Sequence, residues 1–233
     1  MIALIFFSLA CLLEVVDSFA PLVSSRVIFA LRPNWSPALS MTSAEEEYVN
    51  PMTAFLGRFL PTGTSSQGVV DTIDWTSKKK RPKSSLAKLA SDLKASLSLR
   101  EWFVTGNVDT KFFDPDFSFQ DPDVKVRGIE QYARGVAKLF DQRCTRGQII
   151  DCVVNSEVAD TITVTWRLEG RVNLGGGVPI KAFYVYSDLR VNPANGLIVF
   201  QLDRFSIPGW DILTSSLLPW LRLPGLSPPA PPV

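Results

Sequence analysis

The chain has 233 residues, of which 46% are hydrophobic, and its formal net charge at pH 7 is +1. This composition suits one globular domain with extensions, and the near-neutral charge argues against a general nucleic-acid-binding protein, which needs a dominant basic face. Histidine is absent, which excludes Ser-His-Asp triads, Cys-His pairs and most zinc or non-haem iron sites, so we expect neither a metal nor a cofactor.

The chain begins with an apolar segment, which reads IALIFFSLACLL over residues 2–13. Glu14 and Asp17 interrupt it soon afterwards, which makes it too short for a persuasive membrane span. Val16 and Ser18 are small enough for positions −3 and −1 of a signal-peptidase site. Residues 1–18 are therefore predicted to be a signal peptide, with a membrane anchor as the alternative.

The next segment, residues 19–43, has the composition of a transit peptide: no Asp or Glu, five serines, and two arginines. A signal peptide followed at once by Phe19-Ala20-Pro21 resembles the bipartite presequences of algae with secondary plastids. The resemblance implies delivery through the endoplasmic reticulum to the plastid, with a second cleavage near residues 38–41. Because no further apolar signal follows, the chloroplast stroma is expected rather than the thylakoid lumen.

Residues 44–83 are predicted to form a linker. Apolar residues spaced for one helix face at 50–60 predict a short amphipathic anchor, and a turn-rich break follows at 63–68. A basic run, KKKRPK, occupies residues 78–83. We interpret it as a solvated linker; the alternative is an electrostatic, peripheral contact with an anionic membrane or a nucleic acid.

The globular domain is predicted at residues 84–206 and begins with helices. Ser84 or Ser85 is expected to cap a helix that continues to Trp102, and Asp109 to cap a short helix ending at Phe113. One face of the first helix is a row of leucines: Leu86, Leu89, Leu93 and Leu97.

The stretch from 110 to 140 organises the rest of the domain. The pairs Asp114-Pro115 and Asp121-Pro122 bracket residues 117–120, which are predicted to form one short strand because proline interrupts both helix and strand. Gly128 is predicted to begin a helix, because the apolar residues after it recur at helical spacing. That stripe comprises Ile129, Tyr132, Val136, Leu139 and Phe140.

Four β-branched and aromatic runs follow, at 148–158, 161–171, 178–191 and 197–206, each bounded by a turn. The three glycines at 175–177 join strand to strand, so a hairpin is expected there rather than a phosphate loop. Helices first, then a strand, a helix and a four-strand meander predict an α+β fold.

This order, with particular residues in it, resembles the nuclear-transport-factor-2-like (SnoaL-like) superfamily, and within it an uncharacterised plant and algal plastid branch whose domain has no known function. The resemblance lies in Phe113-Asp114-Pro115, residues 117–122 and 128–140, Trp166, Gly196-Leu197-Ile198, Gln201, Asp203 and Phe205. It implies a cone of helices packed on a strongly curved, mostly antiparallel sheet.

Strand alternation predicts which residues face the interior of that cone. If Val191 pairs with Leu197, one face carries Val185, Ser187, Leu189, Val199, Gln201, Asp203 and Phe205. In many relatives the last strand carries a His, an acidic residue and an aromatic residue at the positions held here by Gln201, Asp203 and Phe205. The missing His argues against His-dependent chemistry.

Asp203 is the candidate general base, because burial in an apolar cone raises the pKa of a carboxyl. The alternative is a structural carboxylate that is hydrogen-bonded or paired with an arginine. Asp121 and Arg127 are expected near the mouth, although Asp121 and Asp114 also suit Asx turns. The full candidate ligand pocket comprises Trp102, Asp121, Arg127, Tyr132, Trp166, Phe183, Val185, Ser187, Gln201, Asp203 and Phe205.

Two features remain outside this pocket. Cys11, Cys144 and Cys152 have no CxxC spacing, and we interpret Cys144 and Cys152 as buried thiols, with a redox switch as the alternative. Residues 207–233 are an apolar, Pro-rich tail, expected to pack on the domain or on a partner, with its last seven residues extended and mobile.

Two functions follow as hypotheses. The first is a plastid binding or assembly protein, whose cone holds a small apolar ligand such as a pigment, tetrapyrrole or lipid, or whose tail docks a thylakoid-associated protein or a second copy in a homodimer. The second is a cofactor-free isomerase, lyase or hydrolase that uses Asp203 as its base. The absence of histidine and of cofactor motifs favours the first, and no specific nucleic acid is expected as a partner.

Overall fold

The computed structural model describes residues 47–48, 68–173, 177–218 and 224–233. The predicted signal and transit peptides, and the anchor predicted at 50–60, lie outside the described residues. Within the described ranges, no helix is long and apolar enough to cross a membrane.

A curved, mixed sheet of seven strands forms the framework, in the order β1-β3-β2-β7-β6-β5-β4. Its strands are β1 (Glu47–Tyr48), β2 (Phe113–Gln120), β3 (Val124–Arg127), β4 (Arg146–Val154), β5 (Thr161–Val172), β6 (Val178–Val191) and β7 (Ile198–Phe205). All neighbouring pairs are antiparallel except β2 and β7, which are parallel. The α+β fold with a mostly antiparallel sheet is therefore confirmed.

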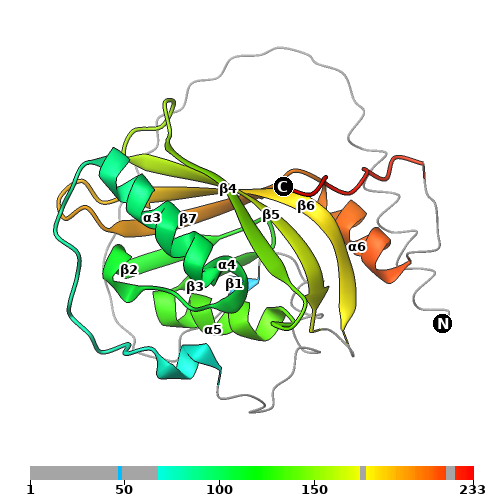
Figure 1. The fold of residues 1–233 in the computed structure, drawn as a ribbon, viewed down its shortest axis with the longest axis horizontal. Helices are drawn as coiled ribbons and strands as arrows, with labels where there is room; N and C mark the ends of the chain where they lie inside the picture. Colours follow the sequence, from blue (N-terminus) through cyan, green and yellow to red (C-terminus); the bar gives the residue numbers. More distant parts are fainter. Residues whose placement is uncertain (1–46, 49–67, 174–176, 219–223) are drawn as a thin grey trace, which may run out of the picture. The chain divides into compact units, whose positions relative to one another are not determined.

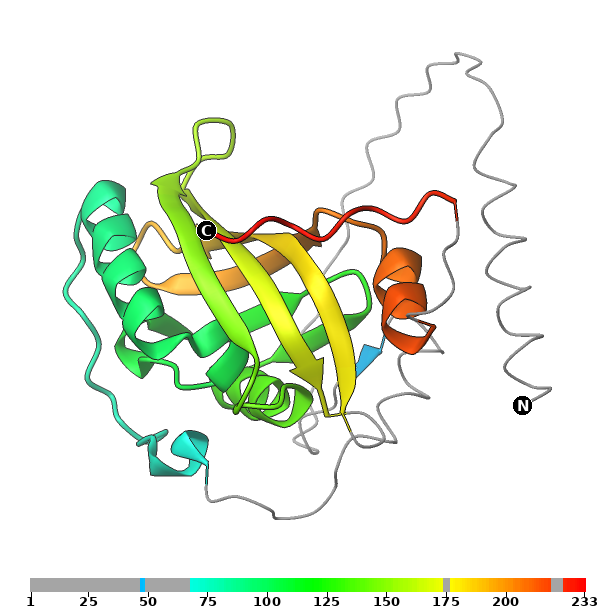
Figure 2. The same cartoon turned by 45° about the vertical axis from the view of Figure 1, so that its right-hand side comes forward.

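Helices cover the concave face of this sheet (Figure 1). They are α3 (Leu86–Arg100), α4 (Trp102–Thr105) and α5 (Ile129–Leu139). Of two short 3-10 turns, η1 (Val69–Thr72) precedes α3 and η2 (Thr110–Phe112) lies between α4 and β2. A last helix, α6 (Gly209–Leu217), lies beside β6 on the other side of the sheet (Figure 2). The layers leave one enclosed interior between the helices and the sheet.

The α3 helix begins as the sequence predicts. The Ser85 side chain accepts a hydrogen bond from the backbone N–H of Lys88, and Leu89, Leu93 and Leu97 are buried against the sheet. The helix does not continue to Trp102, because Glu101 adopts a left-handed conformation with φ of 45° that separates α3 from α4.

The strand predicted at 117–120 is longer than expected, since β2 begins at Phe113 and passes through Pro115. The pairing of β2 with β7 is irregular between Phe113 and Ser118, so no ladder hydrogen bond is required from the proline nitrogen. The sequence prediction also missed β3, a short strand that pairs with β2 and leads through Gly128 into the predicted helix α5.

The last two strands pair two residues away from the predicted register. Leu189 lies opposite Gln201, and the predicted partner of Val191 is wrong: Val191 pairs with Ile198, beside an irregularity at Val199. The two-residue displacement leaves Gln201, Asp203 and Phe205 on their predicted face, because side chains alternate with a period of two. At the irregularity, Ile198 lies opposite Val191 and is buried, in the inward place predicted for Val199, so the inward face of β7 is the predicted one only from Gln201 to Phe205.

Candidate functional site

A polar cluster lies in the interior, where aromatic side chains surround it. Gln201 and Asp203 come from β7, Ser187 lies opposite Asp203 on β6, and Trp166 and Tyr132 come from β5 and α5. All five side chains are buried, and Gln201 and Ser187 are fully inaccessible. The strand alternation and the α5 stripe thus bring together residues as far apart in the sequence as Tyr132 and Asp203.

Hydrogen bonds join the cluster into one network. The Gln201 side-chain amide donates to Asp203 Oδ1 at 3.0 Å and to the Tyr132 hydroxyl at 3.3 Å. The Ser187 hydroxyl accepts from the Trp166 indole N–H at 3.0 Å and, opposite Asp203 on β6, lowers the pKa of that carboxyl. Gln201 and Ser187 thus act on Asp203 from two strands, and no arginine pairs with it among the described residues.

The electrostatics of this cluster keep a proton available near neutral pH. Burial raises the pKa of Asp203 to about 7, against the opposing effect of the hydrogen bonds from Ser187 and Gln201. Burial also raises the pKa of the Tyr132 hydroxyl well above its usual value, and the Asp203 charge adds to the shift. Asp203 therefore changes its charge in the physiological range, while Tyr132 stays neutral.

One atom of the cluster has no partner. The Gln201 carbonyl oxygen, Oε1, is buried and accepts no hydrogen bond within the described part of the chain. A buried acceptor without a donor costs about 1–3 kcal/mol, so a water molecule or a ligand group that donates to Gln201 Oε1 would stabilise the cluster.

Aromatic rings fill the remaining interior. Phe103 of α4 stacks on Trp166 with ring centres 4.9 Å apart, and Phe119 of β2 tilts against Tyr132 at 4.8 Å. The two best-defined hollows in the described ranges lie elsewhere and do not open on Asp203. The rings around the cluster are in close mutual contact, and the apolar pocket expected from the sequence stays a prediction.

The structure places most predicted pocket residues in the interior. Trp102 and Val185 are buried there, and Phe183 of β6 meets Phe205, the last residue of β7, edge to face at 5.6 Å. Arg127 is the exception, because it is exposed and lies on the opposite face of the sheet, paired with Ser118. Its predicted position at the mouth of the cone is wrong. The sequence analysis did not predict β3, and the alternation of side chains along β3 turns Arg127 outward.

Both Asp-Pro corners are Asx turns, the alternative considered from the sequence. Asp121 Oδ1 accepts from the backbone N–H groups of Asp123 and Val124 at 2.8 and 2.6 Å. Burial nevertheless raises the pKa of Asp121, and its charge also raises the pKa of Asp203. Asp114 accepts from the backbone N–H of Asp116 and from the Asn195 side chain, which ties β2 to the turn before β7.

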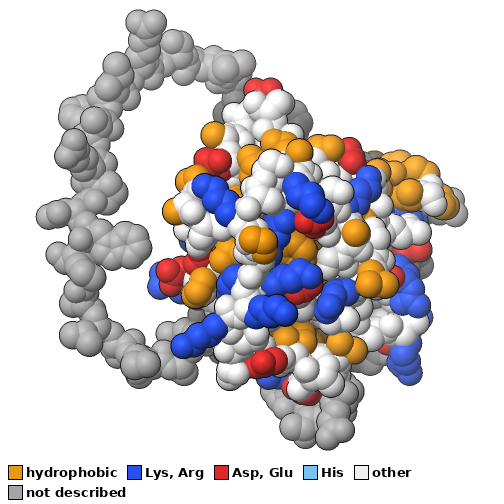
Figure 3. Space-filling view, turned by 60° about the vertical axis from the view of Figure 1, so that its left-hand side comes forward, with side chains coloured by type: hydrophobic (Ala, Val, Ile, Leu, Met, Phe, Trp, Pro, Cys, Tyr) orange, Lys and Arg blue, Asp and Glu red, His pale blue; other side chains and the backbone are white. Residues whose placement is uncertain are grey.

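The basic run is partly built into the domain. Arg81 pairs with Asp92 of α3 at 2.8 Å and lies over the Phe112 ring, while Lys80 donates to the Thr110 carbonyl oxygen. Lys78, Lys79 and Lys83 stay exposed. Figure 3 shows this side of the molecule, where basic side chains are interleaved with acidic ones, so the run does not form a continuous basic face.

The two cysteines that the structure describes differ from each other. Cys152 is buried, and burial raises the pKa of its thiol to about 11, so it stays protonated. Cys144 is exposed, so the expectation that it is buried is wrong. Among the described residues, no group of three or more His, Cys, Asp or Glu side chains is placed to hold a metal ion.

Known proteins resemble this chain at the level of the fold. No family model matches it, and neither does any curated protein. Among solved structures, a candidate SnoaL-like polyketide cyclase from Jannaschia sp. CCS1 is 17% identical, with a TM-score of 0.45, over 60% of this chain and 99% of that one.

Two further solved structures are similar. A hypothetical protein with a ketosteroid isomerase-like fold from Catenulispora acidiphila, in complex with trimethylamine, is 18% identical with a TM-score of 0.40, over 53% of this chain and 91% of that one. An NTF2-like protein of unknown function from Cytophaga hutchinsonii is 13% identical with a TM-score of 0.35, over 54% and 94%. At these identities and TM-scores the likeness concerns the fold alone.

Proposed function

We propose that the protein binds a small molecule in the cone, with Gln201 and Asp203 as its polar contacts. The observation that carries this proposal is the buried, unpartnered Gln201 Oε1, which offers an acceptor to a ligand N–H or O–H group. Aromatic rings around it supply apolar contact, the usual composition of a ligand site. The close ring pairs around it favour a compact ligand, because a pigment, tetrapyrrole or lipid would require several rings to move.

Comparison of wild-type protein with Gln201→Leu tests this binding function. Small molecules released from each purified protein are identified by mass spectrometry. We expect one compound to be enriched in the wild type and to fall about tenfold in the variant, which corresponds to about 1.4 kcal/mol. Arg143→Gln, an exposed change far from the cluster, should retain the compound. Equal recovery from wild type and a folded Gln201→Leu variant would contradict the proposal.

A second candidate is a cofactor-free isomerase, lyase or hydrolase, and the pKa of Asp203 near 7 favours it. A carboxyl with this pKa accepts and returns a proton at neutral pH. Turnover of the released compound should rise with pH through about 7, and Asp203→Asn should lower it on the order of 10²–10⁴-fold while retaining binding. Retained turnover in Asp203→Asn would leave only the binding function.

We also propose that the protein acts in the plastid stroma, on the composition of residues 1–43 and the Phe19-Ala20-Pro21 junction. A fluorescent protein fused behind residues 1–43 should accumulate in the plastid of an alga with a secondary plastid. Replacing Phe19 by Ala should hold the fusion at an earlier stage of the route. Retention of the unchanged fusion in the endoplasmic reticulum would overturn the assignment.

A further inference from the structure

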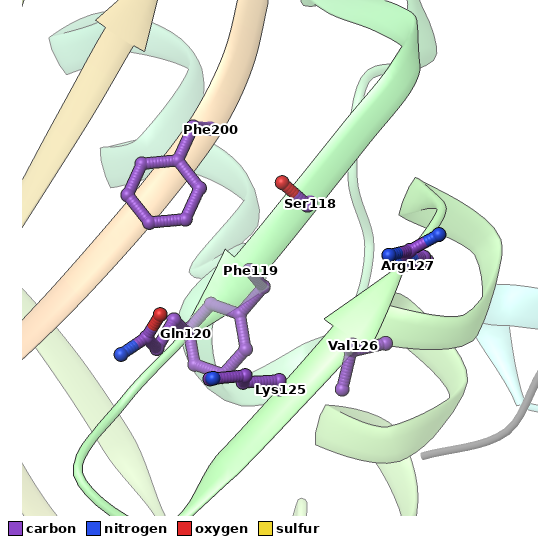
Figure 4. A pocket seen from close by; sticks show the side chains of 7 residues that line it. All are labelled: Ser118, Phe119, Gln120, Lys125, Val126, Arg127 and Phe200. Atoms are coloured by element: carbon purple, nitrogen blue, oxygen red, sulfur yellow. The ribbon is translucent and has the colours of Figure 1, made fainter. Parts of the chain in front are cut away.

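A hollow lies on the outer face of the sheet, away from the cone (Figure 4). Strands β2, β3 and β7 form its floor, and its volume is about 260 Å³. Its lining residues are Ser118, Phe119, Gln120, Lys125, Val126, Arg127 and Phe200. This volume is that of roughly nine water molecules in the liquid, at about 30 Å³ each. It is enough for a single-ring compound with its head group.

Strand alternation gives this hollow its chemistry. Phe119 and Val126 lie opposite each other in the β2–β3 pair and point to the buried side, so their neighbours Ser118, Gln120 and Arg127 face outward. The Phe200 ring stands beside these polar groups from the adjacent strand β7. A hydroxyl, an amide and an aromatic ring thus lie beside basic side chains.

Basic side chains lie at the hollow. Lys125 and Arg127 are exposed; Lys125 lies opposite Glu47 in the β1–β3 pair, whereas Arg127 lies opposite Ser118 and forms no ion pair with any side chain that the structure describes. Arg190 lies over the Phe200 ring, 5.5 Å from its centre, and adds a third cation beside the hollow. The neighbouring carboxylate of Asp188 is already paired with Arg204 at 2.8 Å.

We propose that this hollow binds a small anion that carries an aromatic ring, namely an aryl carboxylate or an aryl phosphate. The Arg127 guanidinium presents parallel N–H groups that match either head group, and Lys125 adds charge without a fixed geometry. The Phe200 ring offers contact to the ligand ring, and Ser118 and Gln120 offer hydrogen bonds at the rim. Binding at this hollow does not depend on the function proposed for the cone, because the two sites lie on opposite faces of the sheet.

Titration of isotope-labelled protein with benzoate and with phenyl phosphate tests the proposal, read as NMR shifts of backbone amides. We expect saturable shifts at residues 118–120 and 125–127, with dissociation constants on the order of 1 mM, as suits an open site. The stronger of the two compounds identifies the head group. Cyclohexanecarboxylate, which lacks the aromatic ring, and benzyl alcohol, which lacks the charge, should each bind at least about fivefold more weakly.

Two variants locate the site, and a third is the matched control. Arg127→Gln should weaken binding of both anions about tenfold, and Phe200→Leu should weaken it about threefold, with unchanged melting temperatures. Arg143→Gln removes the same charge from an exposed arginine elsewhere and should leave affinity unchanged. Equal weakening by Arg143→Gln, or shifts confined to other strands, would overturn the proposal. Sedimentation gives a further check. If Arg127→Gln converts dimers to monomers, the proposal is overturned, because this face would then join two copies of the chain.

Discussion

Asp203 occupies a position that is chemically useful and costly to stability. It is 7% exposed, and its hydrogen bonds to Gln201 and Ser187 compensate only part of the lost hydration, so its pKa rises to about 7. In the unfolded chain an aspartate loses its proton near pH 4, whereas the folded protein keeps the proton of Asp203 up to about pH 7. With respect to Asp203, the folded state is therefore most stable at low pH, where both states are protonated. Stability should therefore decrease as pH rises through the interval between those two values.

The pH dependence of unfolding should show this loss. Between pH 5 and pH 8, the free energy of unfolding should fall by about 3 kcal/mol, because the unfolded carboxyl is already ionised at pH 5 while the folded one, with a pKa of about 7, keeps its proton for about two further pH units. Asp203→Asn cannot titrate and should flatten the curve. Asp141→Asn is the control, because hydrogen bonds from Arg143 lower the pKa of Asp141 to about 2, below the interval. Urea unfolding at both pH values measures the slope, and an unchanged slope in Asp203→Asn would refute it.

The candidate site could be predicted only in part. The alternation of the last two strands identified Ser187, Gln201 and Asp203, because parity survives a register displaced by two residues. Whether the interior is open or filled could not be read from the sequence, since that depends on the volumes of rings from four separate elements. Arg127 was misplaced because the five residues between Pro122 and Gly128 give too short a pattern to indicate the four-residue strand β3.

At the scale of elements, two glycines set the geometry of the helical layer. Gly106 ends α4 with φ of 69°, and a Cβ on it would lie 2.3 Å from the Ala133 carbonyl oxygen of α5. Gly128 begins α5 with φ of 87°, and a Cβ on it would meet nothing within 4 Å. The first glycine thus serves both backbone conformation and helix contact, whereas the second serves conformation alone.

Alanine substitution should separate these two contributions. Gly128→Ala adds only backbone strain and should cost about 1–3 kcal/mol. Gly106→Ala adds similar strain and also forces α4 away from α5, so it should cost about 3–5 kcal/mol. The free energy of unfolding in urea gives both values. Equal costs would mean that α5 can shift to accept the extra methyl group.

At the scale of the molecule, the C-terminal segment is part of the domain. Residues 224–233 run across β6 and β5 (Figure 2), where the Ala230 N–H bonds the Ala182 carbonyl oxygen and Arg167 of β5 donates to the Ala230 carbonyl oxygen. The sequence predicted a mobile end for the last seven residues, which is wrong at Ala230. Proline-rich composition does indicate an extended chain. It does not reveal that Arg167 and Lys181 of the sheet are placed to donate hydrogen bonds to the carbonyl groups of this segment.

The strongest link of this segment is formed by Lys181 of β6, Asp211 of α6 and Ser227. Lys181 pairs with the fully buried Asp211 and donates to the Ser227 carbonyl oxygen at 2.8 Å, and Asp211 accepts from the Ser227 N–H, also at 2.8 Å. Burial opposes ionisation of Asp211, yet these hydrogen bonds outweigh it and lower the pKa of Asp211. The three residues therefore connect strand, helix and tail through one ion pair.

Breaking this pair from either side should release the tail. Lys181→Met and Asp211→Leu each leave an opposite charge buried without its partner, so each should destabilise the protein by about 3–5 kcal/mol. The double variant should cost clearly less than the sum of the two, because it leaves no unpaired charge. Thermal unfolding and limited proteolysis of the C-terminal segment measure the effects.

The exposed pair Arg143–Asp141 is the matched control, and it should show additive effects because water solvates either partner left alone. Additive costs at Lys181 and Asp211 would mean that the two residues stabilise the protein separately. Early proteolytic cleavage within 224–233 in both single variants, together with intact 84–206, would place the loss of stability in the docking of the tail. Cleavage that begins within 84–206 would instead show that the tail and the sheet unfold as one unit, with the C-terminal segment as necessary to the fold as the strands it crosses.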